Sequence, residues 1–62
     1  QRRALRYKMC LPAGTTLAAE QLESLRPCPE GAVTPADLNL VLNRTIKVSK
    51  KTGEEVRWED LE

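Results

Sequence analysis

The chain contains an approximate internal repeat. Two stretches, LPAGTTLAAEQLE and KKTGEEVRWEDLE, resemble each other when Gly14 of the first is superimposed on Gly53 of the second, 39 positions later. Further positions of similar character then coincide: Tyr7 with Ile46, Met9 with Val48, Leu17 with Val56, Glu20 with Glu59, Leu22 with Leu61 and Glu23 with Glu62. Because the chain has 62 residues, each half has room only for short elements. We therefore expect one small domain, residues 1–62, whose halves are related by an approximate two-fold axis.

Each half is expected to run from a short strand through a tight turn into a second short strand and then a helical turn. Tyr7, Met9 and Leu11 alternate with a lysine and a cysteine, and Ile46 and Val48 alternate with a lysine and a serine. This period of two is typical of half-buried strands. The glycine of each half follows turn-forming residues, at a place where a positive φ costs glycine little. Acidic residues just ahead of a leucine then indicate one or two helical turns.

The segment TPADLNLVLNRT between the halves predicts one short helix at about residues 35–42. Thr34 can cap this helix, Pro35 suits its first position, and Asp37 stands where a capping box places its acidic residue. The apolar face consists of Leu38, Val41 and Leu42. Asn43 can adopt the left-handed conformation that ends a helix. The fold class that we expect is mostly β, with short strands, this short helix and single helical turns.

Composition limits the function classes. Ten basic and nine acidic side chains leave a formal charge of +1, which is too little for a typical nucleic-acid binder. No apolar run approaches the roughly 20 residues that cross a bilayer, and QRRALRY lacks the hydrophobic centre of a signal peptide, so we expect a soluble, cytoplasmic protein. The chain has no histidine, which removes the usual general base and leaves a zinc site short of ligands. We expect no catalytic residue, metal ion or cofactor within this domain.

Cys10 and Cys28 are the two cysteines, and we favour reduced thiols, while a single disulfide stays open on sequence grounds. Cys28 is interpreted as a small apolar turn residue, because it has no histidine base to activate it. The core of so small a domain is marginal, since such a chain buries only about 60% of the surface that its unfolded form exposes. The core must rest on leucine, valine, isoleucine and methionine, with Trp58 lying half over it.

Four segments, in this order along the chain, carry a resemblance to a known family: LPAGTTL, EQLESLRP, LVLNR and EDLE. They resemble the SAF domain, also called the antifreeze-like domain, over about Arg3 to Glu62. The most similar version is the C-terminal domain of bacterial sialic acid (N-acetylneuraminate) synthases. The resemblance implies a β-clip fold, which is a pseudo-symmetric arrangement of short strands. It also implies that the chain is the C-terminal part of a larger enzyme with an N-terminal TIM barrel.

Enzymes of this kind condense phosphoenolpyruvate with N-acetylmannosamine, or a related amino sugar, using a divalent metal such as Mn²⁺ or Mg²⁺ held by the barrel. In that family the SAF domain crosses to the barrel of the partner subunit in a homodimer. The arginine of its R-P segment contacts the sugar substrate, and this position corresponds to Arg26. The resemblance thus implies that the domain completes the partner's active site through Arg26. The low net charge and the lack of a long apolar run add that neither nucleic acid nor a membrane is expected among its partners.

The residues around Arg26 allow this role and a simpler one. Pro27 removes backbone freedom and biases Arg26 away from the helical region. The donor-rich side chain therefore stands on a stiff, extended segment suited to binding oxygen atoms. Alternatively, Arg26 forms a surface ion pair with Glu23 or Glu30, worth about 0–1 kcal/mol. The sequence leaves both interpretations open.

The other basic residues are interpreted as solvated. Arg2, Arg3 and Arg6 form a basic run that we assign to the linker from the barrel. Lys50 and Lys51 are placed in a turn and assigned to solubility. Neither group is expected to bind a ligand.

Two further function classes stay open. A free-standing ice-binding protein of the type III antifreeze kind shares this fold and length. The small residues Thr15, Thr16, Ala18 and Ala19 favour it, whereas Glu20 and the 31% content of charged residues oppose it. Another SAF protein, such as a flagellar or pilus assembly chaperone or a sugar-acid dehydratase, is the third possibility. The LRP segment and the terminal EDLE fit these proteins less well.

Overall fold

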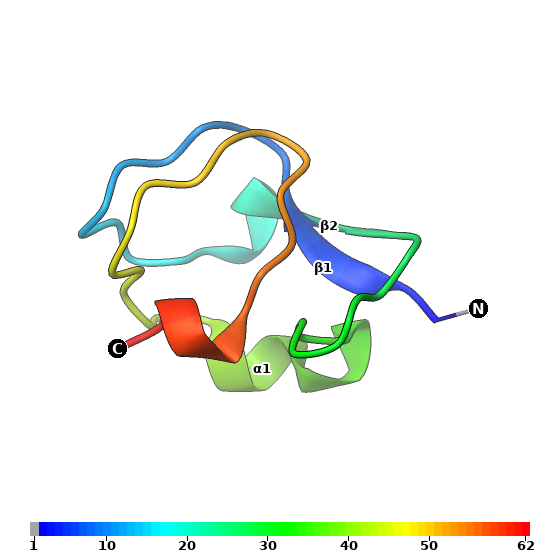
Figure 1. Ribbon diagram of the computed structural model, residues 1–62. Helices are drawn as coiled ribbons and strands as arrows, with labels where there is room; N and C mark the ends of the chain where they lie inside the picture. Colours follow the sequence, from blue (N-terminus) through cyan, green and yellow to red (C-terminus); the bar gives the residue numbers. More distant parts are fainter. Residues whose placement is uncertain (1) are drawn as a thin grey trace.

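The computed structural model describes residues 2–62, all but the first position of the expected domain. Two short antiparallel strands, β1 (Ala4–Tyr7) and β2 (Leu22–Leu25), form a sheet in which Tyr7 lies opposite Leu22. One α-helix, α1 (Leu38–Val41), lies beneath this sheet in Figure 1. The 3₁₀ turns are Ala19–Gln21, Pro35–Asp37 and Trp58–Asp60. The expectation of a small, mostly non-helical β-rich fold is confirmed.

The tight turns of the two halves form equivalent hydrogen bonds. The Gly14 N–H donates to the carbonyl oxygen of Ile46 at 2.8 Å, and the Gly53 N–H donates to that of Tyr7 at 2.8 Å. Donors and acceptors are both related by the offset of 39 positions seen in the sequence. The two glycines have φ angles of 94° and 90°, in the region that glycine enters at little cost. The prediction of two equivalent glycine turns is confirmed.

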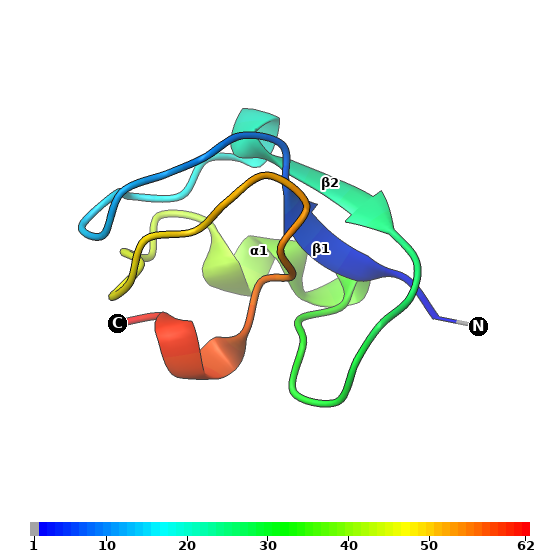
Figure 2. The same ribbon diagram turned by 45° about the horizontal axis from the view of Figure 1, so that its top comes forward.

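Leu11 and Lys50 mark the centre of the pseudo-symmetry, because they are equivalent positions that pair with each other. The Leu11 N–H donates to the Lys50 carbonyl at 2.9 Å, and the Lys50 N–H donates to the Leu11 carbonyl at 2.8 Å. Two arches of the chain, residues 8–18 and 47–57, therefore run side by side, as Figure 1 and Figure 2 both show. Each arch leads into a 3₁₀ turn at an equivalent position. The second strand expected ahead of each 3₁₀ turn is wrong, because these segments pair only through isolated bridges, at Thr16 in the first half and at Glu55 and Arg57 in the second. The approximate two-fold axis predicted from the sequence is confirmed.

One apolar core joins the two halves. Its buried members are Leu5, Tyr7, Leu11, Leu17, Leu22, Val33, Val41, Ile46, Val56 and Leu61. The inward positions expected for Met9 and Val48 are wrong, since these side chains are 42% and 45% exposed. The chain bends at residues 8–9 and at residues 47–48, which interrupts the strand alternation and leaves both side chains on the surface. Trp58 is 39% exposed, as expected for a ring half over the core.

The helical segment differs in detail from the single helix expected at residues 35–42. Pro35–Asp37 is a 3₁₀ turn, and only Leu38–Val41 is α-helical. Thr34 occupies the capping position, but its hydroxyl makes no capping hydrogen bond, because the turn is closed by the Thr34 main-chain carbonyl at 3.0 Å. Asn43 follows the helix with a φ of 71°, as predicted. Across residues 2–62, no helix has the length and apolar character that crossing a membrane requires.

Lys50 lies in the interior, so its assignment to solubility is wrong, whereas Lys51 is exposed as expected. The Lys50 ammonium forms an ion pair with the Asp60 carboxylate at 2.7 Å and lies 5.9 Å from the centre of the Tyr7 ring. The physical reason is the position of Lys50 on the pseudo-axis, opposite the buried Leu11. A charge at such a place needs a partner, and Asp60 supplies it.

Both cysteines are free thiols, as favoured on sequence grounds. Cys10 is exposed, and hydrogen bonds with the backbone and side chain of Thr52 lower the pKa of its thiol. Cys28 is half-buried, with its Sγ atom 3.8 Å from the carbonyl oxygen of Pro29. This contact with its own loop agrees with the interpretation of Cys28 as a turn residue.

Candidate functional site

Arg26 directly follows β2, where the chain bends away from the sheet, and its side chain is exposed. The peptide bond between Arg26 and Pro27 is cis. Within residues 2–62 the Arg26 guanidinium forms neither an ion pair nor a side-chain hydrogen bond, so the surface pairs considered with Glu23 and Glu30 are not formed. Arg26 is thus a donor-rich side chain that the domain leaves available for other contacts.

Arg6 holds the loop that carries Arg26. It lies on β1, and its Nη2 atom donates a 2.6 Å hydrogen bond to the carbonyl oxygen of Pro27, the residue after Arg26. Its Nη1 atom donates to the carbonyl oxygen of Gly53 at 2.9 Å. The assignment of Arg6 to a solvated linker is therefore wrong, because β1 already includes this residue and only 13% of its side chain is exposed.

Arg57 holds the same loop farther along. Its Nη1 atom donates to the carbonyl oxygen of Glu30 at 3.0 Å, and its backbone forms a bridge with Ala32. The guanidinium passes close to Gly31, which has a φ of 87°; a Cβ atom at this position would lie 3.1 Å from Arg57 Nη1. Glycine at position 31 thus allows both the turn and the approach of the arginine.

Glu55 links the two arginines. Its carboxylate lies 3.6 Å from Arg6 Nη1 and 2.7 Å from Arg57 Nη2, and it also accepts a 2.8 Å hydrogen bond from Arg57 Nε. A hydrogen bond from its own backbone and that from Arg57 hold the pKa of this carboxyl below its usual value. Arg6, Glu55 and Arg57 together form what we call the loop clamp, which fixes the chain at the carbonyl groups of Pro27 and Glu30. The stiffness inferred around Arg26 thus comes from the clamp as well as from the prolines.

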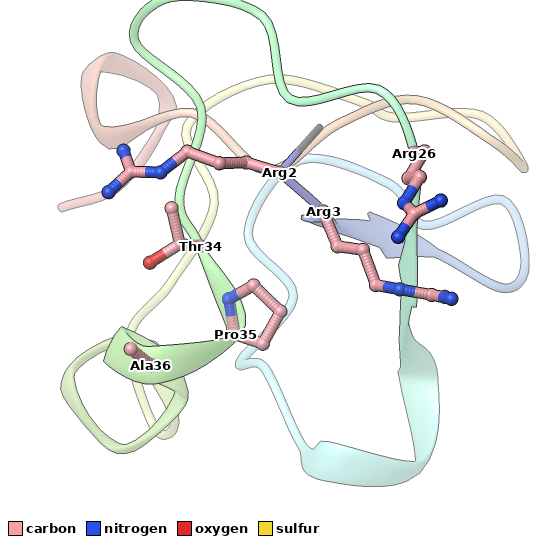
Figure 3. Close-up of a pocket in the computed structure, with 6 residues that line it drawn as sticks. All are labelled: Arg2, Arg3, Arg26, Thr34, Pro35 and Ala36. Atoms are coloured by element: carbon pink, nitrogen blue, oxygen red, sulfur yellow. The ribbon is translucent and has the colours of Figure 1, made fainter.

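Arg26 also lines a surface pocket of about 370 Å³, shown in Figure 3. The lining residues are Arg2, Arg3, Arg26, Thr34, Pro35 and Ala36. Arg3 is fixed by a 3.2 Å hydrogen bond from its Nη1 atom to the carbonyl oxygen of Ser24, on β2. In Figure 3 the Arg3 and Arg26 side chains extend on one side of Pro35, and that of Arg2 extends on the other. We call this hollow the arginine pocket.

The arginine pocket is lined by basic, small apolar and hydroxyl side chains, and by no acidic ones. Half of its six lining residues are arginines, and no carboxylate side chain lines it. Pro35 and Ala36 provide an apolar wall, and the Thr34 hydroxyl is not used as a helix cap. Guanidinium groups donate hydrogen bonds in a planar fork that matches carboxylate and phosphate oxygens. The sequence interpretation of Arg2 and Arg3 as linker residues missed this gathering, which depends on the pairing of β1 with β2.

The fold and this site define a small pseudo-symmetric β-rich domain that presents Arg26 on a clamped loop. Residues 2–62 match the SAF domain family, and the chain belongs to this family. No curated protein matches the sequence.

Proposed function

We propose that this SAF domain is the accessory domain of a sialic-acid-synthase-type enzyme. In this proposal Arg26 contacts the amino-sugar substrate in the active site of the partner subunit. The partners are the N-terminal TIM barrel of that subunit, in a domain-swapped homodimer, and the amino sugar. The divalent metal and the bond-forming chemistry belong to the barrel, and the two free thiols suit a cytoplasmic setting.

The observation that carries the proposal is the available guanidinium of Arg26 on a fixed loop. The other arginines near this loop are engaged within the domain: Arg6 and Arg57 bind Glu55 and main-chain carbonyls. Arg26 has no such partner within residues 2–62. Because the backbone beside Arg26 is already fixed, binding of a ligand has to order only its side chain, which favours a role in recognition.

The path of the chain around Arg26 supports the same proposal. Arg26 directly follows β2, and the loop from Arg26 to Val33 leads from the sheet towards the 3₁₀ turn Pro35–Asp37. Arg6 and Arg57 fix this loop at the carbonyl groups of Pro27 and Glu30, and Arg26 supplies its binding chemistry.

The test is the replacement Arg26→Ala in the enzyme that contains this domain. We expect the KM for the amino sugar to rise by about tenfold or more, because one charge-assisted hydrogen bond contributes about 1.5–3 kcal/mol. The KM for phosphoenolpyruvate should change little. Arg44→Ala is the matched control, since Arg44 is an exposed arginine outside the arginine pocket. Unchanged amino-sugar kinetics in Arg26→Ala would contradict the proposal.

A further inference from the structure

We propose that the arginine pocket is a binding site for a small molecule that carries a carboxylate or phosphate group. This inference does not rest on the proposed contact of Arg26 with an amino sugar. It concerns the domain by itself, and it assigns a binding role to Arg3 as well as to Arg26.

The distribution of charge is the first argument. The chain as a whole is close to neutral, with a formal charge of +1. Three cations outside the pocket have a carboxylate partner: Lys50 lies 2.7 Å from Asp60, Arg57 lies 2.7 Å from Glu55, and Arg6 lies 3.6 Å from Glu55. Three arginines line the arginine pocket without a carboxylate among its lining residues, and the Arg3 and Arg26 side chains extend on the same side of Pro35 (Figure 3). Like charges at one site repel one another, and a bound anion would relieve this repulsion.

The support of these side chains is the second argument. Arg3 directly precedes β1, and its Nη1 atom donates a hydrogen bond to the Ser24 carbonyl on β2. Arg26 stands at the end of β2, immediately before the Pro27 carbonyl that the loop clamp holds. The two guanidinium groups are thus supplied by neighbouring strands whose register pairs Ala4 with Leu25. Donors placed by a paired sheet lose little freedom when they bind an anion.

The size and polarity of the pocket indicate the class of ligand. Its volume of about 370 Å³ is near the lower end of the range of small-molecule sites, and it exceeds what a bare ion needs. The arginines would bind the anionic group in forked hydrogen bonds. The Thr34 hydroxyl offers a further polar contact, and Pro35 and Ala36 offer an apolar wall for the rest of the molecule. Figure 3 shows these residues around the same hollow.

The experiment is a titration of the chain with sodium phosphate and, in a separate arm, with sodium acetate, at constant ionic strength adjusted with chloride. Backbone and arginine Nε resonances are followed by ¹⁵N NMR. We expect saturable shifts at Arg3, Arg26 and Thr34. The arm with the stronger binding identifies phosphate or carboxylate as the preferred group.

Variants separate a site from general attraction by positive charge. Arg26→Gln and, independently, Arg3→Gln should weaken binding about tenfold, which corresponds to about 1.4 kcal/mol. Arg44→Gln removes one exposed charge outside the pocket and should change the affinity less than about twofold. The dispersion of each spectrum reports whether the variant is folded. Absence of saturation with both anions, or an equal loss of affinity in Arg44→Gln, would overturn the proposal.

The result also separates this inference from the proposed function. Anion binding by the chain alone, together with unchanged enzyme kinetics in Arg26→Ala, would support the pocket and contradict the amino-sugar contact. The reverse pair of results would support the amino-sugar contact and overturn the anion site.

Discussion

The Nη2 atom of Arg6 donates a 2.6 Å hydrogen bond to the carbonyl oxygen of Pro27. This bond connects β1 to the loop that begins at Arg26, and Glu55 lies within 3.6 Å of the same guanidinium. The position of Arg26 therefore depends on a carboxylate in the second half of the chain. The loop that carries Arg26 is thus connected, through Arg6, to the second half of the chain.

Replacing Glu55 by glutamine should loosen the loop. The variant keeps the shape of the side chain but removes the charge that Arg6 and Arg57 share. We expect the free energy of unfolding to fall by about 1 kcal/mol, since these groups are only partly buried. Amide exchange of Ala32, whose N–H donates to the Pro29 carbonyl at 3.1 Å, should become faster. Glu20→Gln, at an exposed position, is the control; equal exchange rates at Ala32 in both variants would refute the clamp.

The clamp should also respond to acid. The pKa of Glu55 in the folded chain lies below its ordinary value of 4.5, because its own backbone and Arg57 donate hydrogen bonds to the charged form. Its contribution to stability is therefore fully present above pH 4.5 and is lost as the pH falls through the lower folded-state pKa. Protection of the Ala32 amide, measured between pH 6 and pH 2, should decline in this range. The decline should be absent in Glu55→Gln.

Replacing the buried ion pair by the residues found at the equivalent positions of the first half should preserve the stability of the domain. Lys50 and Asp60 are equivalent to Leu11 and Gln21. Asp60→Gln alone leaves the Lys50 ammonium without its 2.7 Å partner and should cost about 1–3 kcal/mol. The double variant Lys50→Leu/Asp60→Gln should return to within about 1 kcal/mol of the parent, since a well-packed apolar group can replace a buried pair. Urea denaturation measures the free energy of unfolding of both variants. A double variant no more stable than Asp60→Gln would contradict the expectation that Leu11 and Gln21 show which residues can replace the ion pair.

Tyr7→Phe should leave the domain as stable at pH 7, or more stable by about 1 kcal/mol, because the buried hydroxyl has no hydrogen-bond partner among the described residues. Burial, with Asp60 and Glu54 nearby, raises the pKa of this phenol from 10.0 to about 12. Above pH 10 the unfolded chain loses the phenol proton while the folded chain keeps it. The free energy of unfolding, unaffected by this group below pH 10, should therefore fall by about 1.4 kcal/mol per pH unit up to pH 12. Urea denaturation at pH 9–12 should show a steeper loss in the parent than in Tyr7→Phe; equal slopes would argue against the raised pKa.

Adding a methyl group at Gly31 should disturb the clamp more than adding one at Gly14. Both glycines have a positive φ, so alanine is strained at each and should cost about 1 kcal/mol. At Gly31 the new Cβ would also lie 3.1 Å from Arg57 Nη1, whereas nothing lies within 4 Å of it at Gly14. Thermal denaturation should therefore show the lower Tm for Gly31→Ala. Equal Tm values would mean that Arg57 moves aside freely.

The internal repeat predicted more of the fold than any single motif did. Because the glycine turns fall at equivalent positions, the offset between them anticipates which backbone groups pair across the pseudo-axis. The same offset aligns Lys50 with the apolar residue Leu11, and this alignment would have identified Lys50 as an interior residue. Composition indicated the opposite, since a lysine in a polar stretch is normally solvated. The bends at Met9 and Val48 are local departures from strand geometry that an alternating pattern does not reveal.

The candidate site was only partly predictable. Arg26 stands out through its prolines, but the residues that hold it act on main-chain carbonyls, which have no signature in the sequence. Arg6 reaches Pro27 and Gly53, and Arg57 reaches Glu30, only because the two arches lie side by side. Such contacts follow from the path of the backbone, which the order of residue types does not specify. The pocket formed by Arg2, Arg3 and Arg26 depends in the same way on the register of β1 and β2.

Subunit mixing tests most directly whether Arg26 acts in the active site of a partner. One population of the enzyme carries Arg26→Ala with an intact barrel, and the other keeps Arg26 but carries an inactivated barrel. Each homodimer alone, assayed at an amino-sugar concentration well below the parental KM, should be inactive or strongly impaired. After subunit exchange, a mixed dimer contains one intact barrel that receives Arg26 from the other subunit, so we expect activity to return to about a quarter of the parental value, since half the dimers are mixed and each has one competent site. Failure of the mixture to exceed the two separate homodimers, with exchange verified, would contradict the proposal.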